Sequence, residues 1–199
     1  MYVIAFVARV RGSLGGTALA AWFAVMTLVC AGLLARHVLA MPAPTRSARL
    51  AHHLAALRHA DTPHAWLAVH VLDSECKCSQ RVVAHLVETA RPSDFTEVVL
   101  WVGPVSPSPE LVQRFDVRRV TAEDLARYEI EAAPLLIVVS PEDRVDYAGG
   151  YTDRKQGPVF HDLEILASVR GSRPVQSLPL FGCATSDRLR NALSTLPLP

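Results

Sequence analysis

Acidic residues are missing from the first part of this 199-residue sequence. No Asp or Glu precedes Asp61, whereas residues 1–60 contain six arginines. The remainder holds fourteen Lys or Arg against nineteen Asp or Glu, and no continuous basic stripe. Sequence-independent binding of nucleic acid depends on clustered positive charge, so no nucleic-acid partner is expected. The two parts of the chain are expected to occupy different surroundings.

Phosphate-loop and serine-nucleophile chemistry have no support in the sequence either. The segment "VRGSRP" at 169–174 lacks the Gly-rich turn that ends in Lys and Ser or Thr. No internal repeat is evident. Cysteine is also scarce, with four residues in the chain, at positions 30, 76, 78 and 183. Two of them, Cys76 and Cys78, are separated by one lysine, so they are candidates for a redox couple or a metal ligand pair.

A charge-free apolar run near the start predicts a membrane helix. Residues 14–35 are 22 residues without a charge, which as a helix extend about 33 Å, enough for one crossing. Arg9 and Arg36 lie on opposite sides of this run, so flanking charge does not decide its orientation. The alternative is a cleaved signal peptide ending at "VLA", residues 38–40, but its apolar region is too long for one. Cys30 lies within the run as a small apolar side chain.

The sequence divides into four parts. They are an N-terminal region with the anchor (1–40, anchor about 14–35), a linker with a short amphipathic helix (41–62), an α/β domain (63–171) and a C-terminal extension with Cys183 (172–199). Leu50, Leu54 and Leu57 give the short helix its apolar face, and Thr45 or Ser47 is available as its cap. The histidines at 52, 53 and 59 are expected on its solvated face.

Stretches typical of strands and helices alternate through the α/β domain, which predicts a mixed sheet flanked by helices. The expected strands are 66–72, 96–103, 135–140 and 145–151, and the expected helices are 79–90, 109–115, 121–128 and 161–169. Thr121 and Asp124 are spaced for reciprocal capping. Leu163, Leu166 and Val169 are spaced to face a core.

This order of elements resembles the thioredoxin fold over residues 66–170. Cys76 and Cys78 lie between the first strand and its helix, where thioredoxin-like oxidoreductases carry their reactive cysteines. Pro134, in "APLLIVV", resembles the proline that this superfamily holds in the cis form beside the reactive cysteine. Taken together, the two features indicate a cis bond here, whereas an ordinary proline at that point would lie at the edge of the sheet.

Within that superfamily the chain resembles the membrane-anchored RedB proteins. The likeness rests on the anchor, "CKCS" at 76–79, "YAGGYT" at 147–152 followed by Asp162, and "PLFGC" at 179–183. It departs from them in having lysine at position 77, where proline is common. The resemblance implies a single-pass protein of the inner membrane, with its domain in the periplasm. It does not supply a client.

The chemistry expected from these residues is thiol-disulfide exchange. A cysteine at a helix N-terminus is stabilised as the thiolate, which is the attacking species. Cys76 is expected to attack, Cys78 or Cys183 to resolve, and Pro134 to support the client backbone. A bridge across one intervening residue distorts the backbone, so a Cys76–Cys78 disulfide is expected to be labile. The partners are a client protein disulfide and an unidentified electron donor or acceptor.

Several alternatives stay open at this stage. Cys76 and Ser79 also match a Cys-x-x-Ser motif with one reactive thiol, in which Cys78 takes no part in the reaction. Cys183, beside a Gly182 that permits a sharp turn and ahead of a helix capped by Thr185 or Ser186, is either a resolving thiol or an inert one.

Two other functions compete with exchange. Cys76 and Cys78 with His161 form a candidate set for copper in a metal chaperone, whereas the exchange hypothesis needs no cofactor. A redox-inactive module that binds partners is the third hypothesis. Asp73 or Glu75 is a candidate proton acceptor, although a solvated loop acid is the simpler interpretation. Trp66, His70 and Trp101 are expected to be packing residues.

Overall fold

The computed structural model describes residues 16–33 and 39–194. It divides into two units, which are described separately: an N-terminal helix, and a compact unit that begins at Ala40. The helix Gly16–Leu33 has a mean hydropathy of 1.8 and is long and apolar enough to cross a membrane. The outer residues of the predicted anchor (14, 15, 34 and 35), its flanking Arg9 and Arg36, and residue 38 of the cleavage-like site lie outside the described residues.

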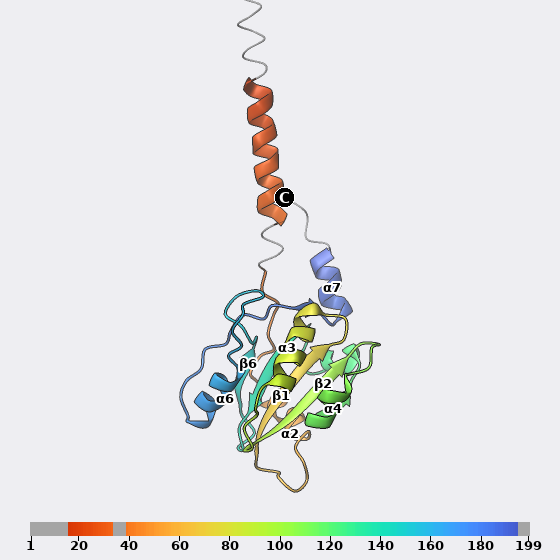
Figure 1. Ribbon diagram of the computed structural model, residues 1–199, viewed down its shortest axis with the longest axis vertical. Coiled ribbons are helices and arrows are strands. Elements are labelled where there is room, and N and C mark those ends of the chain that lie inside the picture. Colours follow the sequence, from red (N-terminus) through yellow and green to blue (C-terminus); the bar gives the residue numbers. More distant parts are fainter. Residues whose placement is uncertain (1–15, 34–38, 195–199) are drawn as a thin grey trace, which may run out of the picture. The chain divides into compact units, whose positions relative to one another are not determined.

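A five-stranded mixed sheet forms the centre of the compact unit (Figure 1). In spatial order its strands are β3 (Asp116–Arg119), β2 (Phe95–Val102), β1 (Trp66–Asp73), β5 (Leu135–Val139) and β6 (Val145–Gly149). The first three strands run parallel to one another, and β5 and β6 are antiparallel to their neighbours. The central strand β1 is buried on both faces, which its nearly continuous apolar sequence requires.

Helices cover both faces of this sheet. They are α2 (Ala48–Ala55), α3 (Lys77–Glu88), α4 (Pro109–Arg114), α5 (Ala122–Ala126) and α6 (Asp162–Arg170), followed by α7 (Asp187–Ser194). Val69 and Val71 of β1 face a core that contains residues of α2 and α5. Ala68 and Leu72 face the opposite core, with residues of α3, α4 and α6. The alternation of β1 side chains thus places α3, with its cysteine turn, over one face.

A second, two-stranded sheet brings the C-terminal extension back to the domain. It consists of β4 (Ala132–Ala133) and β7 (Cys183–Ala184), which pair antiparallel. The extension also makes a bridge between Leu180 and Met41. Residues 172–194 therefore lie against the α/β domain.

The predicted elements were found with small shifts at their ends, and the local caps were confirmed. Ser47 caps α2 through a bond from the Leu50 amide, and Thr121 and Asp124 form the predicted capping box of α5. The histidines at 52, 53 and 59 are exposed, as expected.

Three features differ from the sequence prediction, and the first is the β4–β7 sheet described above. Strand β3 was not predicted, because its sequence, Asp-Val-Arg-Arg, is short and polar and its pairing with β2 alone defines it. The buried face of α6 also differs: Ile165, Leu166 and Val169 are buried together with Asp162, whereas Leu163 is only half-buried. An acidic residue, Asp162, is therefore part of the buried face of α6.

Candidate functional site

Cys76 occupies the N-cap of α3, directly after β1. Its backbone is extended (φ −85°, ψ 115°), and its side chain makes no capping hydrogen bond. The turn before it is fixed by Asp73, whose carboxylate accepts from the Glu75 amide at 2.8 Å, and by Ser74, whose amide donates to Val102. The sulfur therefore lies at the positive end of the helix dipole, as the sequence predicted. The residue is 1% exposed.

Three thiols meet at this position. Interactions with the side chains of Cys183 and then of Cys78 lower the pKa of Cys76. All three cysteines are unbridged, and they come from two distant parts of the chain. Cys78 lies in the first turn of α3, and Cys183 arrives on β7. The structure therefore brings together the three predicted site cysteines.

The pKa values of the three cysteines differ in direction. Hydrogen bonds from Cys183 and then from Cys78 lower the pKa of Cys76, and these outweigh the opposing effect of burial. The same hydrogen bonds, together with burial, raise the pKa of Cys78 and of Cys183 above their ordinary values. The lowered pKa of Cys76, beside the raised pKa values of its two neighbours, favours the thiolate on Cys76.

Ala133 and Pro134 complete the site. The Ala133–Pro134 peptide bond is cis, as the sequence indicated. The carbonyl oxygen of Ala133 lies 3.7 Å from the sulfur of Cys76. Ala133 also stands opposite Cys183 in the β4–β7 pair. The residue before the proline therefore connects the buried cysteine to the C-terminal cysteine.

A small pocket lies beside the cysteines. Its lining includes Cys78, Arg81, Pro134, Tyr151 and Phe181. Arg81 and Lys155 are positive charges that partly oppose the raised pKa of Cys78. The pocket thus combines apolar walls with positive charge next to the helix that carries the thiols.

Ser79, the serine of the Cys-x-x-Ser alternative, has a structural role. Its side chain is fully buried, and its hydroxyl accepts a 3.0 Å hydrogen bond from the Asp73 amide. That bond ties the first turn of α3 to the end of β1. Among the two acids next to the turn, Glu75 is exposed, consistent with a solvated loop acid, and Asp73 is buried as part of the turn.

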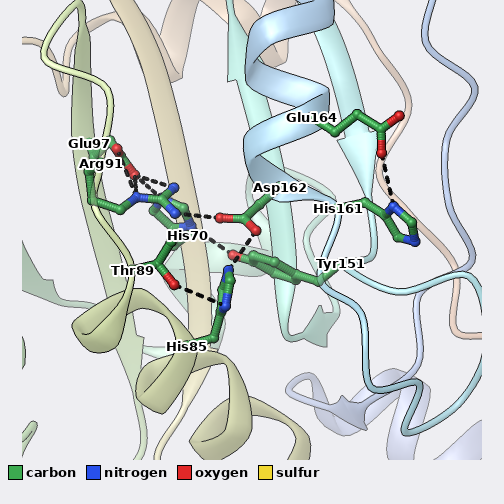
Figure 2. A network of polar contacts seen from close by, with 9 residues as sticks. All are labelled: His70, His85, Thr89, Arg91, Glu97, Tyr151, His161, Asp162 and Glu164. Atoms are coloured by element: carbon green, nitrogen blue, oxygen red, sulfur yellow. Dashed lines mark hydrogen bonds and ion pairs between the residues drawn. The ribbon is translucent and has the colours of Figure 1, made fainter.

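The candidate copper set is not assembled. Within residues 16–33 and 39–194, no group of three or more His, Cys, Asp or Glu is placed to hold a metal ion. His161 instead has its Nδ1 at 3.1 Å from Glu164, one turn along α6. Figure 2 shows this pair apart from the neighbouring buried network. In this structure the partner of His161 is therefore Glu164.

A buried polar network lies behind the pocket, and the sequence did not predict it (Figure 2). His70, expected as a packing residue, is fully buried but has polar partners on both ring nitrogens. Its Nε2 lies 2.8 Å from Glu97 and its Nδ1 lies 2.8 Å from the Tyr151 hydroxyl. Because a carboxylate only accepts, Nε2 carries a proton, and in the neutral ring Nδ1 accepts from Tyr151. Tyr151 also lines the pocket beside Cys78.

Arg91 links the network to α6. Its guanidinium donates to both carboxylate oxygens of Glu97 at 2.8–3.1 Å and to Asp162 at 2.5 Å. The other oxygen of Asp162 lies 2.7 Å from Nε2 of His85. Burial opposes the ionisation of Glu97 and Asp162, but the partners of each prevail and hold both pKa values below the ordinary range. Burial raises the pKa of Tyr151 well above its ordinary value, so its hydroxyl stays a donor.

Two solved structures are similar to part of this chain. An uncharacterized conserved protein from Geobacillus kaustophilus is 18% identical, with a TM-score of 0.49, over 62% of this chain and 77% of that one. A hypothetical protein from Sinorhizobium meliloti 1021 is also 18% identical, with a TM-score of 0.49, over 61% of this chain and 79% of that one. Neither name states an activity. No protein family and no curated protein matches the sequence.

Proposed function

We propose that this chain is a membrane-anchored thiol-disulfide oxidoreductase of the thioredoxin-like superfamily, acting on a protein disulfide in an oxidising compartment. One observation carries the proposal: the sulfur of Cys76, at the N-terminus of α3, lies 3.7 Å from the carbonyl oxygen of Ala133, which precedes the cis peptide bond of Pro134 and pairs with Cys183. A buried thiol with a purely structural role needs no second cysteine opposite it. Stabilising a thiolate at a helix N-terminus is what disulfide exchange requires.

The proposed reaction conserves electrons and protons. The Cys76 thiolate attacks a client disulfide, forms a mixed disulfide, and releases one client sulfur as a thiolate. A second thiol of the chain, Cys78 or Cys183, loses its proton and attacks Cys76. The second client sulfur leaves and takes up a proton, and the new disulfide remains on this chain. Two electrons have then passed to the client, and an external dithiol restores the reduced state.

The proposed location follows from the anchor and from the resemblance to RedB proteins. The helix Gly16–Leu33 is long and apolar enough to span a bilayer. We place it in the inner membrane as a single pass, with the compact unit in the periplasm, where disulfides persist. Clients of maturation pathways for cytochromes or other metalloproteins fit this location by analogy with the superfamily.

Mass spectrometry of the full chain in detergent micelles tests the proposal. The purified protein is treated with a disulfide oxidant or with a dithiol, its free thiols are alkylated, and the modified sites are mapped. Exchange predicts two forms that differ by about 2 Da, with the bridge mapped to two of the three site cysteines. The control is Cys30→Ala, which removes the cysteine of the N-terminal helix and should leave the result unchanged.

The same spectra distinguish the competing functions. A copper ion retained under native conditions, and lost in Cys76→Ala, would replace the proposal with metal binding. If the three site thiols stay reduced and metal-free under oxidant, the chain is not an exchange enzyme. The remaining hypothesis is then partner binding without redox chemistry, in which cysteine-to-serine variants keep their function.

A further inference from the structure

The residue with the stabilised thiolate is the one that a client disulfide cannot reach. Cys76 is 1% exposed, whereas Cys183 is exposed and Cys78 is half-buried. Hydrogen bonding and burial raise the pKa of the two accessible thiols, which makes them poor nucleophiles. Exchange at this site therefore requires the cover over Cys76 to move.

Residues 181–184, which we call the cover segment, lie against Ala133 and Pro134, and the Ala133 carbonyl oxygen is 3.7 Å from the sulfur of Cys76. The cover segment is held at each end by a backbone hydrogen bond. On one side the carbonyl of Leu180 accepts from the Met41 amide at 2.7 Å, and on the other the Thr185 amide donates to the Glu131 carbonyl at 2.7 Å. Between these points only β7, two residues long, pairs with β4. Because Cys183 is exposed and Ala184 half-buried, releasing β7 exposes little apolar surface.

Gly182 shows how closely the cover segment lies on β4. A Cβ built on Gly182 would stand 1.9 Å from the carbonyl oxygen of Ala133 and 2.7 Å from Cδ of Pro134. Any side chain at position 182 therefore requires the segment to move away from β4. Glycine at this position is needed for the close approach of two backbones.

The cover segment presents a cysteine on an extended strand at the reactive sulfur. Cys183 stands opposite Ala133 in antiparallel register, and the Ala133 carbonyl oxygen lies 3.7 Å from the sulfur of Cys76. An extended peptide with a cysteine, paired to β4 in place of β7, would bring its own sulfur to Cys76 in the same way. Adding a strand to an exposed edge provides backbone hydrogen bonds without demanding a particular side chain.

We propose that β7 is an internal substitute for the client: it occupies the edge of β4 and lifts off to admit an extended, cysteine-bearing client strand. This inference rests on the proposed function, and it adds the shape of the partner and the movement that precedes reaction. Opening uncovers the sulfur of Cys76 and the β4 edge together. A client that cannot pair as a strand gains access to the sulfur of Cys76 but does not bind the β4 edge.

The movement also separates the roles of the two remaining thiols. When a client strand replaces β7, Cys183 leaves the sulfur of Cys76, while Cys78 stays in the same turn of α3. Cys78 therefore resolves the mixed disulfide: it gives up its proton, bonds to Cys76, and releases the client sulfur, which is protonated. Cys183 returns with β7 when the client has left.

The test uses the reduced full chain in detergent micelles and three probes. The first is a short peptide of β-branched residues around one cysteine, activated as a mixed disulfide with 2-thiopyridine. The second is the same peptide with N-methylated amides on both sides of the cysteine, which cannot donate to a strand edge. The third is 2,2′-dithiodipyridine, which has no peptide backbone. The measured quantity is the rate of thiopyridone release, with the modified residue mapped by mass spectrometry.

Two variants open the cover and one serves as control. Gly182→Ala forces the segment off β4. Arg188→Ala removes the ion pair to Glu131, next to the end of the segment. It is a second way to loosen the segment, in case Gly182→Ala does not fold. Gly171→Ala is the matched control, because its Cβ would meet its nearest neighbour at an ordinary 3.4 Å. Hydrogen exchange of the Ala133 amide, which faces Cys183 in a hydrogen-bonded pair, reports whether β7 is in place.

We expect Gly182→Ala to speed modification of Cys76 by all three probes at least about tenfold, since an open state populated at 10% or less limits the wild type. Arg188→Ala should speed it less, and Gly171→Ala should match the wild type. In the open variant the unmodified peptide should react faster than the N-methylated one. Its attachment should slow hydrogen exchange in β4 again.

Two results would overturn the inference and leave exchange chemistry standing. One is equal reactivity of Cys76 in the wild type and in a Gly182→Ala protein whose Ala133 amide exchanges freely, because β7 would then not be a barrier. The other is equal rates for the peptide and its N-methylated form in the open variant, because the β4 edge would then not pair with the client. If Cys76 resists even 2,2′-dithiodipyridine in the open variant, the proposed function itself fails.

Discussion

The sulfur of Cys76 lies 3.7 Å from the carbonyl oxygen of Ala133. A thiol donates a weak hydrogen bond to such an oxygen, whereas a thiolate gains nothing from facing it. An anion at Cys76 therefore depends on other groups, and the side chains of Cys183 and then of Cys78 lower the pKa of Cys76 most. The acidity of Cys76 is thus set by side chains more than one hundred positions apart.

Replacing Cys183 with alanine should raise the pKa of Cys76, because it removes the donor that lowers this pKa most. The pH titration of thiolate ultraviolet absorbance, in a Cys30→Ala background, measures the change. At a pH below the new midpoint the thiolate population should fall by roughly tenfold, the effect of a difference of about 1.4 kcal/mol. Cys183→Ser keeps a hydroxyl donor and should shift the titration less.

Cys78→Ala is the second comparison for this titration. It removes the smaller of the two side-chain contributions, so its midpoint should lie between those of the wild type and Cys183→Ala. A midpoint that stays unchanged in Cys183→Ala would show that the helix and its backbone amides alone stabilise the thiolate.

The parts of the fold that the sequence predicted are those fixed by neighbouring residues. Thr121 and Asp124 form a capping box within three positions of sequence. The apolar run of β1 predicts a buried strand without information on the strands that pair with it. The turn that places Cys76 at a helix N-terminus was readable for the same reason. The cis bond at Pro134 was expected from resemblance, not from periodicity.

The parts that were missed depend on contacts between distant residues. Asp162 looked like an ordinary acid at a helix start, but it is buried because Arg91, 71 positions away, and His85 bind it. Gly182 was expected to permit a sharp turn. The structure gives it no positive φ and instead places it against the Ala133 carbonyl, which only the paired strands reveal.

Arg91→Ala should destabilise the fold strongly. The side chain of Arg91 is 11% exposed and pairs with Glu97 (6%) and Asp162 (0%), so its loss leaves two buried carboxylates without their cation. Breaking a buried pair in this way costs about 3–5 kcal/mol. Arg170→Ala removes an exposed pair with Asp94 and should cost at most about 1 kcal/mol. Denaturant unfolding of the full chain in micelles measures the free energy of unfolding of both variants. Equal losses of this free energy would contradict a stabilising role of the buried Arg91 pairs.

The same network predicts acid sensitivity. The folded pKa values of Glu97 and Asp162 are lowered, so their contribution to stability is complete above the ordinary carboxyl pKa, about 4, and is lost as the pH falls through the lowered values. Glu97→Gln should be less stable than the wild type at neutral pH and should lose less on acidification. The two stability curves should converge at low pH, whereas Glu110→Gln, at an exposed position, should follow the wild type. Parallel curves for Glu97→Gln would exclude this carboxylate as a source of the acid sensitivity.

The N-terminal helix should hold the protein in the membrane against alkaline carbonate extraction. Val25 lies near the middle of Gly16–Leu33, and an arginine there costs roughly 2.5–3.5 kcal/mol of insertion free energy. Val25→Arg should therefore release part of the protein to the soluble fraction, and Val25→Leu should not. A C-terminal reporter that is active only after export should be active on the wild type. Activity of a cytoplasmic reporter instead would reverse the proposed orientation.

The resolving thiol can be identified from the variant in which the mixed disulfide with Cys76 accumulates. If Cys78 resolves, Cys78→Ala should trap the mixed disulfide between Cys76 and a cysteine peptide, because no second thiol remains in the turn of α3 once β7 has been displaced. Cys183→Ala should still release the peptide and form a Cys76–Cys78 bridge. Non-reducing mass spectrometry of the full chain, after reaction with the activated peptide, separates the two outcomes. Accumulation in Cys183→Ala but not in Cys78→Ala would assign resolution to Cys183 and require β7 to stay close to Cys76 while the client is bound.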